Sequence, residues 1–291
     1  MLSGIYKLTY NKLEILGVKK EDRLVDEIAI LQKKPISRFG IDFDRAGAHT
    51  SRTLMLDELT ALLSYVTDPE ASKTDYINAI VHDNCLNKRT LANRKITSRD
   101  LIKLYTLAPQ ITIFRVLIYF WGRDPNARPL LALLCAYCRD SLLRGTAPFV
   151  FDFEEFATVD REQLETFIDN LYPDRFSAAT LRSVAKNLNS SWTQTGHLTG
   201  RVRKTRAKAQ ATSGSVSFAL FLGYLMGERG ESLFQTEFVK LLDCSLDQAI
   251  ELAEEASRRG WIVFKRVGKT IEVVFPNLLT KQEMEWLREQ G

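Results

Sequence analysis

The chain has 291 residues, and its 40 Lys and Arg against 36 Asp and Glu give a formal net charge of +4 at pH 7. This length suits two domains, since one domain commonly takes roughly 100–200 residues. A hydrophobic fraction of 45% is ordinary for a globular protein and excludes a disordered or fibrous chain. No run of about 18 apolar residues occurs, which predicts no membrane span. Four cysteines without a disulfide-like pattern, and a first segment without signal-peptide features, predict a reduced, cytoplasmic protein.

The first half predicts an N-terminal arm, residues 1–52, followed by a helical domain, residues 53–150. Apolar residues at helical spacing indicate helices at 53–66 and 74–82. The next segment, 85–105, carries six cations and one carboxylate, and it is typical of a helix-turn-helix whose later helix is basic outside and apolar inside. Strongly apolar runs at 111–121 and 129–143 predict a helical hairpin that forms the core of this domain.

Residues 151–215 predict an acidic linker helix and a basic loop. The acidic part spans 149–172, and a helix with a serine cap is expected at 178–188. Five cations then fall within the eight residues 201–208. Such a cluster is consistent either with contact to phosphates or with a solvated, flexible loop.

Residues 216–276 predict a winged helix, and 277–291 a short C-terminal helix. Helices are expected at 216–226, 233–242 and 246–259, with Ser245 as a cap and Gly260 as a left-handed stop. Two β-rich runs, 261–265 and 270–275, are joined by a turn that contains glycine, which indicates a hairpin. The fold class is therefore mainly α, with two helical domains of helix-turn-helix character, the C-terminal one a winged helix with a small β-hairpin.

Motifs for catalysis or metal binding are not evident. Cys135 and Cys138 have a metal-like spacing, but a structural zinc site needs four ligands, and no second pair exists. Because this pair sits in an apolar helix, we expect two buried core thiols. The sequence has three histidines and lacks the hydrolase, zinc-protease and P-loop motifs, so we expect no enzymatic activity, no metal and no cofactor.

Three groups of residues form the predicted DNA-binding set, because Lys and Arg release counterions from phosphates and aromatic rings can stack on bases. We expect these groups to gather on one side of the molecule, where most contacts go to the backbone. The first group is Lys88, Arg89, Arg94, Lys95, Arg99 and Lys103; the second is Trp192, Gln194, His197, Arg201, Arg203, Lys204, Arg206 and Lys208; the third is Lys265, Arg266 and Lys269.

The third helix of the predicted winged unit carries four carboxylates, which would repel phosphates: Asp247, Glu251, Glu254 and Glu255. This helix is therefore a poor candidate for entering a major groove. Two interpretations stay open. Either the hairpin contacts DNA, or the unit docks a protein, together with the C-terminal helix around Trp286.

The sequence of residues 76–90, YINAIVHDNCLNKRT, followed by the basic helix 94–105, resembles the BrxA-type accessory proteins of bacteriophage-exclusion (BREX) loci. The apolar segment 111–143 is similar to the corresponding segment of that family. The resemblance implies a helical, non-enzymatic, double-stranded-DNA-binding component of a bacterial phage-defence system. The alternatives are a scaffold or adaptor subunit that docks a larger defence or DNA-processing protein, and a dimeric transcriptional regulator.

Overall fold

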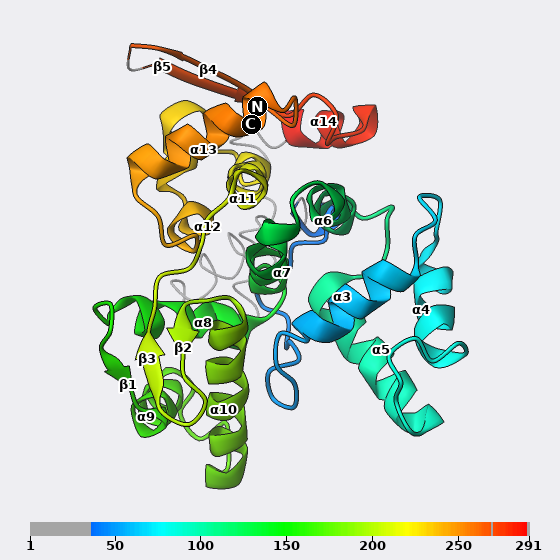
Figure 1. The fold of residues 1–291 in the computed structure, drawn as a ribbon, viewed down its shortest axis with the longest axis vertical. Coiled ribbons are helices and arrows are strands. Elements are labelled where there is room, and N and C mark those ends of the chain that lie inside the picture. Colours follow the sequence, from blue (N-terminus) through cyan, green and yellow to red (C-terminus); the bar gives the residue numbers. More distant parts are fainter. Residues whose placement is uncertain (1–35, 269, 290–291) are drawn as a thin grey trace, which may run out of the picture.

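The computed structural model describes residues 36–268 and 270–289 (Figure 1). Most of the predicted arm, residues 1–35, and the predicted DNA contact Lys269 therefore lie outside the described residues. The protein is mainly helical, as the sequence predicts, with two small antiparallel sheets. No helix in the described ranges is long and apolar enough to cross a membrane.

Three helices, α3 (Leu56–Tyr65), α4 (Lys73–Val81) and α5 (Leu91–Tyr105), form one corner of the molecule (Figure 1). Ser72 begins α4 with a capping box, and the Thr90 side chain accepts a hydrogen bond from the Asn93 backbone N–H at the start of α5. The ring of Tyr76 on α4 packs edge-on against Phe114. The corner is thereby fixed on the central helices.

The centre of the molecule consists of α6 (Thr112–Arg123), α7 (Arg128–Tyr137) and α11 (Ser213–Leu225). Every residue of α11 except Tyr224 is buried, as expected of a helix that is apolar all round. α11 contacts α6 and α7 on one side and α12 (Glu237–Lys240) and α13 (Leu246–Arg258) on the other. The predicted domains 53–150 and 216–276 therefore share one hydrophobic core.

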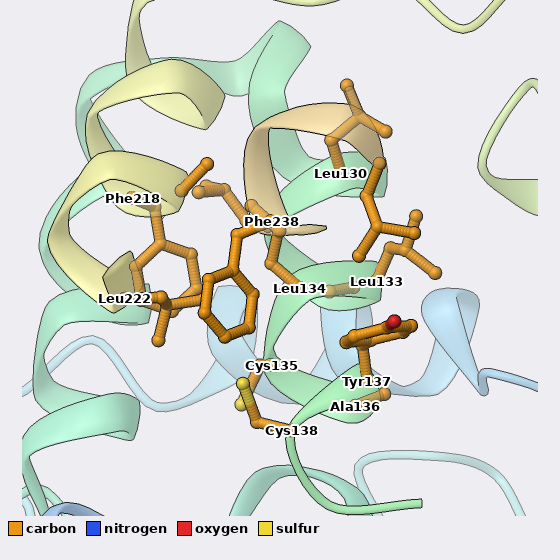
Figure 2. Close-up of a cluster of buried hydrophobic side chains, with 14 of the residues drawn as sticks. Leu130, Leu133, Leu134, Cys135, Ala136, Tyr137, Cys138, Phe218, Leu222 and Phe238 are labelled. Atoms are coloured by element: carbon orange, nitrogen blue, oxygen red, sulfur yellow. The ribbon is translucent and has the colours of Figure 1, made fainter. Parts of the chain in front are cut away.

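The predicted hairpin at 111–143 is confirmed as α6 and α7, and the two thiols lie in its core. Cys135 and Cys138 are fully buried beside aromatic rings that include Phe218 and Phe238 (Figure 2). Burial raises the pKa of Cys135 to about 12, which keeps the thiol protonated and unreactive. The helix ends earlier than expected, because Asp140 accepts the N–H groups of Leu142 and Leu143 and so begins a new helix, α8 (Ser141–Phe151).

The next helices are α9 (Arg161–Leu171) and α10 (Ala178–Gln194). A small sheet that the sequence did not predict joins the segment before α9 to the segment after α10. Its strands are β1 (Thr158–Val159), β2 (Leu198–Thr199) and β3 (Lys204–Arg206), in the order β1-β3-β2 and antiparallel. The prediction of a basic loop at 201–208 is thus wrong for 204–206, which form the central strand. Strands of two or three residues are too short to give an alternating pattern.

The C-terminal elements follow the predicted order: η4 (Gly230–Gln235), α12, α13, β4 (Val263–Val267), β5 (Thr270–Val274) and α14 (Lys281–Arg288). Ser245 caps α13 by accepting the Gln248 N–H, and Gly260 takes the left-handed conformation with φ +72°, both as predicted. The predicted helix 233–242 is instead a 3-10 segment followed by α12. The hydroxyl of Thr236, which accepts the Val239 N–H, separates the two.

The C-terminal helix α14 packs on this chain. Glu283 accepts hydrogen bonds from Arg115 of α6, with the shortest N–O distance 2.6 Å, and the ring of Trp286 lies edge-on to Phe39 at 5.9 Å. Arg38 covers the same indole. The Trp286 ring is thus partly buried within the chain, and docking of a partner around it stays a prediction.

Candidate nucleic-acid interface

The first turns of α5 extend beyond the core of the α3–α5 corner. From Arg89 to Ile96 every residue except Arg94 is exposed, whereas Leu101, Leu104 and Tyr105 at the other end of the helix are fully buried. Burial therefore begins at Thr97, in the second turn of α5. The part of the helix that carries the predicted cations is the part that the protein leaves open.

Two cations of the first group hold the connection between α4 and α5. Lys88 Nζ donates to Glu58 at 3.0 Å, and Arg94 Nη1 donates to the carbonyl of Val81 at 2.9 Å, at the last residue of α4. A side chain that satisfies orphan carbonyls at a helix end fixes that end. Lys88 and Arg94 therefore position α5 rather than project from it.

Asp100 forms a buried anchor further along α5. Its carboxylate, with a side chain only 1% exposed, contacts Arg52 Nε at 3.2 Å and Arg99 Nη2 at 2.9 Å, with Lys103 Nζ 4.0 Å away. Three cations surrounding one carboxylate leave a net positive charge. The Arg99 side chain remains 60% exposed while this ion pair holds it in place.

Arg89 and Lys95 are exposed, and neither has an ion-pair partner in the described part of the chain. Residues 84–99 contain no Asp or Glu. Asp83, just before this segment, accepts a hydrogen bond from the hydroxyl of Tyr65 at 3.3 Å, and Asp100, just after it, is the buried partner of Arg99. Residues 89–99, which end the α4–α5 connection and begin α5, thus have three outward cations, Arg89, Lys95 and Arg99, and the adjacent carboxylate of Asp100 is buried.

Two aromatic members of the second group are buried. Trp192 and His197 are both 0% exposed and lie edge-to-face, with ring centroids 5.1 Å apart. His197 Nε2 lies 2.9 Å from the carbonyl oxygen of Leu241 and Nδ1 lies 2.8 Å from the Thr195 hydroxyl. Burial lowers the pKa of His197 to about 4, so the ring is neutral and donates from Nε2. The prediction that Trp192 and His197 contact DNA is wrong, because enclosed rings cannot reach a ligand.

Arg206 is also buried, at 6% exposure, and it is a structural residue. Its guanidinium donates to Asp243 at 2.8 Å and to the backbone carbonyl of His197 at 3.2 Å. These bonds tie the small sheet to the end of α12. The prediction that Arg206 contacts DNA is therefore corrected, and Gln194, half-buried at the end of α10, likewise does not belong to an open surface.

The remaining cations of the second group lie on an edge of mixed charge. Arg201, Arg203 and Lys208 are exposed, and Lys204 Nζ donates to the carbonyl of Gly200 at 2.6 Å. The pairing of β1 with β3, and the bond from the Phe156 N–H to the Arg206 carbonyl at 2.9 Å, place the acidic segment 152–162 next to this strand. Nearby carboxylates weaken the attraction of a phosphate backbone to this edge.

The third group lies on the hairpin β4–β5. Lys265 pairs with Glu272 on the opposite strand at 3.5 Å, and Arg266 is exposed near the carbonyl of Gly268. Figure 1 places α5, the β2–β3 turn and this hairpin at three separate corners. The three groups therefore do not form the one contiguous basic face that we expected.

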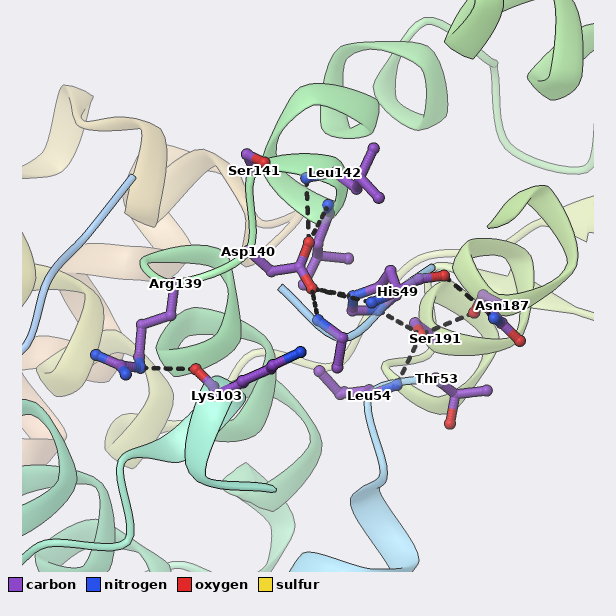
Figure 3. Close-up of polar contacts among 12 residues, drawn as sticks. His49, Thr53, Leu54, Lys103, Arg139, Asp140, Ser141, Leu142, Asn187 and Ser191 are labelled. Atoms are coloured by element: carbon purple, nitrogen blue, oxygen red, sulfur yellow. Dashed lines mark hydrogen bonds and ion pairs between the residues drawn. The ribbon is translucent and has the colours of Figure 1, made fainter. Parts of the chain in front are cut away.

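A buried polar cluster that the sequence did not reveal joins three distant segments (Figure 3). Asp140 accepts from His49 Nδ1 at 2.7 Å and from the Ala48 N–H at 2.7 Å, and His49 Nε2 lies 2.9 Å from the Ser191 hydroxyl. A Cβ at Gly47 would collide with Asp140, so glycine is needed for this approach. Partners 91 and 142 positions apart leave no local pattern that could have predicted them.

The hydrogen bonds link Ser191, His49 and Asp140 as in a catalytic Ser-His-Asp triad, but the cluster lacks the access to substrate that a catalytic triad needs. All three side chains are fully buried. The Ser191 oxygen also accepts the Leu54 N–H at 2.8 Å and lies 2.8 Å from the Asn187 carbonyl, so its proton and lone pairs are engaged. A nucleophile needs access to a substrate and an oxyanion site. The geometry is that of a clamp between residues 47–54, α8 and α10.

Burial would raise the pKa of Asp140, but the charge of His49 and the hydrogen bonds from His49 and from the Leu143 N–H outweigh it and hold this pKa below its ordinary value. The carboxylate is thus ionised within the clamp.

Among the described residues, no group of three or more His, Cys, Asp or Glu could hold a metal ion.

No protein-family model matches the chain, and no curated protein matches it. A function must therefore be inferred from the geometry of the chain itself.

Proposed function

We propose that this chain is a non-catalytic protein that binds double-stranded DNA through α4, the connecting segment 82–90 and α5. In this arrangement α5 enters the major groove and α4 lies across it, as in helix-turn-helix proteins. One observation carries the proposal: the end of the connecting segment and the first turns of α5 present Arg89, Lys95 and Arg99 to solvent, and the one carboxylate beside them, Asp100, is buried under Arg99.

The connection between the two helices is longer than the three or four residues of a short helix-turn-helix. It is nevertheless held at both ends. The Lys88 N–H donates to the Asn84 side chain at 2.8 Å, and Arg94 reaches back to the carbonyl of Val81. A recognition helix fixed in this way loses little conformational freedom when it binds, which favours affinity.

The test is a titration of a fluorescent duplex at several salt concentrations. If Arg89, Lys95 and Arg99 each neutralise one phosphate, log K falls against log salt with a slope of about −2.7 from these residues alone. Neutralising each of the three to Gln is expected to reduce the slope by about one unit. Binding that is absent at low salt, or that does not respond to salt, would rule out the proposal.

We also propose that residues 216–276 form a winged-helix unit that docks a protein. Asp247 and Glu251 on α13 are exposed, which disfavours DNA at the helix that would normally enter the groove. The test is co-purification of a stoichiometric subunit from the native locus with the wild-type chain and with Asp247→Lys/Glu251→Lys. A subunit retained equally by both would contradict docking through this face.

The biological setting that we propose is bacterial phage defence of the BREX type. Its support is the resemblance of residues 76–105, which include the turn and the recognition helix of the proposed DNA-binding unit. Deletion of the gene from its native locus is expected to raise phage plating efficiency, and complementation with the wild-type chain is expected to reverse this. Unchanged plating would contradict the assignment.

A further inference from the structure

The open turns of α5 expose apolar side chains as well as cations. Leu91 is 48% exposed and Ile96 is 40% exposed, and Ala92 lies between them in sequence. Single exposed apolar residues are common on protein surfaces. Here three occur within six positions, on a helix whose other outward residues are largely cationic.

Helical spacing places these residues relative to the cations. Ala92, Lys95, Ile96 and Arg99 are at positions i, i+3, i+4 and i+7, so they share one stripe. This stripe faces away from the core, because Leu101, Leu104 and Tyr105 define the opposite, buried face. Leu91 and Asn93 lie on either side of the stripe in the first turn, where no core lies beneath them.

We propose that Leu91, Ala92 and Ile96 read thymine through its C5-methyl group in the major groove, a reading that rests on the proposed DNA-binding function. The N-terminal residues of a recognition helix are the ones that reach base edges. Lys95 and Arg99, on longer side chains along the same stripe, reach phosphates beyond the base edges. The shorter apolar side chains of Leu91, Ala92 and Ile96 meet the floor of the groove, where the thymine methyl is the one apolar group.

Asn93 extends the same preference to the paired base. Its side chain is exposed and has no partner within the described residues, because only its backbone N–H is bonded, to the Thr90 hydroxyl. An asparagine amide matches the N6 and N7 atoms of adenine. Because the first turns of α5 would recognise both thymine and adenine, the expected ligand is a duplex that contains A·T pairs.

The test compares two duplexes of equal length, alternating d(A-T) and alternating d(A-U), at one salt concentration. Both have the same phosphates and base-pairing groups, and only the C5-methyl groups differ. The wild-type chain is expected to bind d(A-T) more tightly, by about fourfold for each methyl group that becomes buried. The variant Leu91→Ala/Ile96→Ala is expected to lose most of the preference for d(A-T), keeping only the part due to Ala92, with its d(A-U) affinity unchanged.

Leu171→Ala is the matched control, because Leu171 on α9 is 43% exposed and lies outside the interface. It is expected to keep the wild-type preference. Equal binding of both duplexes by the wild type would overturn base reading and leave DNA binding intact. A methyl preference that is undiminished in the double variant would overturn the assignment to Leu91 and Ile96. Failure to bind either duplex would instead reject the proposed function.

Discussion

The two basic segments of this chain, 88–103 on α5 and 201–208 around β3, have similar cation counts but different fates. On α5 the structural work falls to Lys88 and Arg94, while Arg89, Lys95 and Arg99 face outward. Around β3, Arg206 is buried in an ion pair with Asp243, and an acidic segment runs alongside the strand. A dense run of Lys and Arg is therefore a candidate DNA-binding surface only where the fold exposes the cations and keeps carboxylates away from that surface.

The largest effect is expected from reversing the open charges of α5. Arg89→Glu/Lys95→Glu/Arg99→Glu should weaken duplex binding by roughly three orders of magnitude at low salt, because three phosphate contacts become repulsive. Gel-shift titration measures this, and circular dichroism checks that the exposed substitutions leave the fold intact. Retention of wild-type affinity would remove α5 from the interface.

Arg206→Met should act on stability rather than on DNA contact. The change leaves the carboxylate of Asp243 without its buried partner, which costs about 3 kcal/mol of unfolding free energy. Urea denaturation measures the loss, and duplex affinity is expected to stay within about twofold where the variant is folded. Asp243→Asn/Arg206→Met should recover part of the stability. A large affinity loss in a fully folded Arg206→Met variant would return Arg206 to the interface.

His197 gives the same region a pH dependence. Its pKa is lowered from 6.5 to about 4 in the folded state by burial, so the unfolded chain binds a proton that the folded chain rejects. The free energy of unfolding is therefore unaffected by the titration of His197 above pH 6.5, and it decreases as the pH falls from 6.5 toward 4. Urea midpoints between pH 7 and pH 5 are expected to drop for the wild type and to drop less for His197→Gln. Equal slopes would place the titration elsewhere.

The sequence predicts the parts of this fold that depend on neighbours in the chain. Ser245, Gly260 and the apolar hairpin at 111–143 are examples, because capping and amphipathic periodicity act over a few residues. The cations of α5 were found in the same way. Which of them remain open could not be predicted, since that depends on Glu58 and on the end of α4.

The incorrect predictions of DNA-contact residues depend on contacts between distant parts of the chain. Trp192, His197 and Arg206 match DNA contacts by residue type, but they are enclosed by Phe151, Leu241 and Asp243 respectively, each more than 30 positions away in sequence. The clamp of His49, Asp140 and Ser191 was missed for the same reason. Burial of a polar residue is a property of the tertiary fold, and residue type alone does not reveal it.

The smallest effect is expected from the exposed turn between β2 and β3. Arg201→Gln/Arg203→Gln should change duplex affinity by less than about threefold, because nearby carboxylates already offset the charge of this edge. Fluorescence anisotropy at fixed salt measures the change. A loss of tenfold or more would show that this edge takes part in the main contact.

The most direct test of a DNA interface on α5 compares the salt dependence of two neutralised variants with that of the wild type. Arg89→Gln/Lys95→Gln removes two open charges from α5, and Arg201→Gln/Arg203→Gln removes two from the β2–β3 turn, so net charge is matched. We expect the first variant to lose about two units of slope and the second close to none. Equal losses in both variants, or a larger loss from the β2–β3 turn, would contradict an interface on α5.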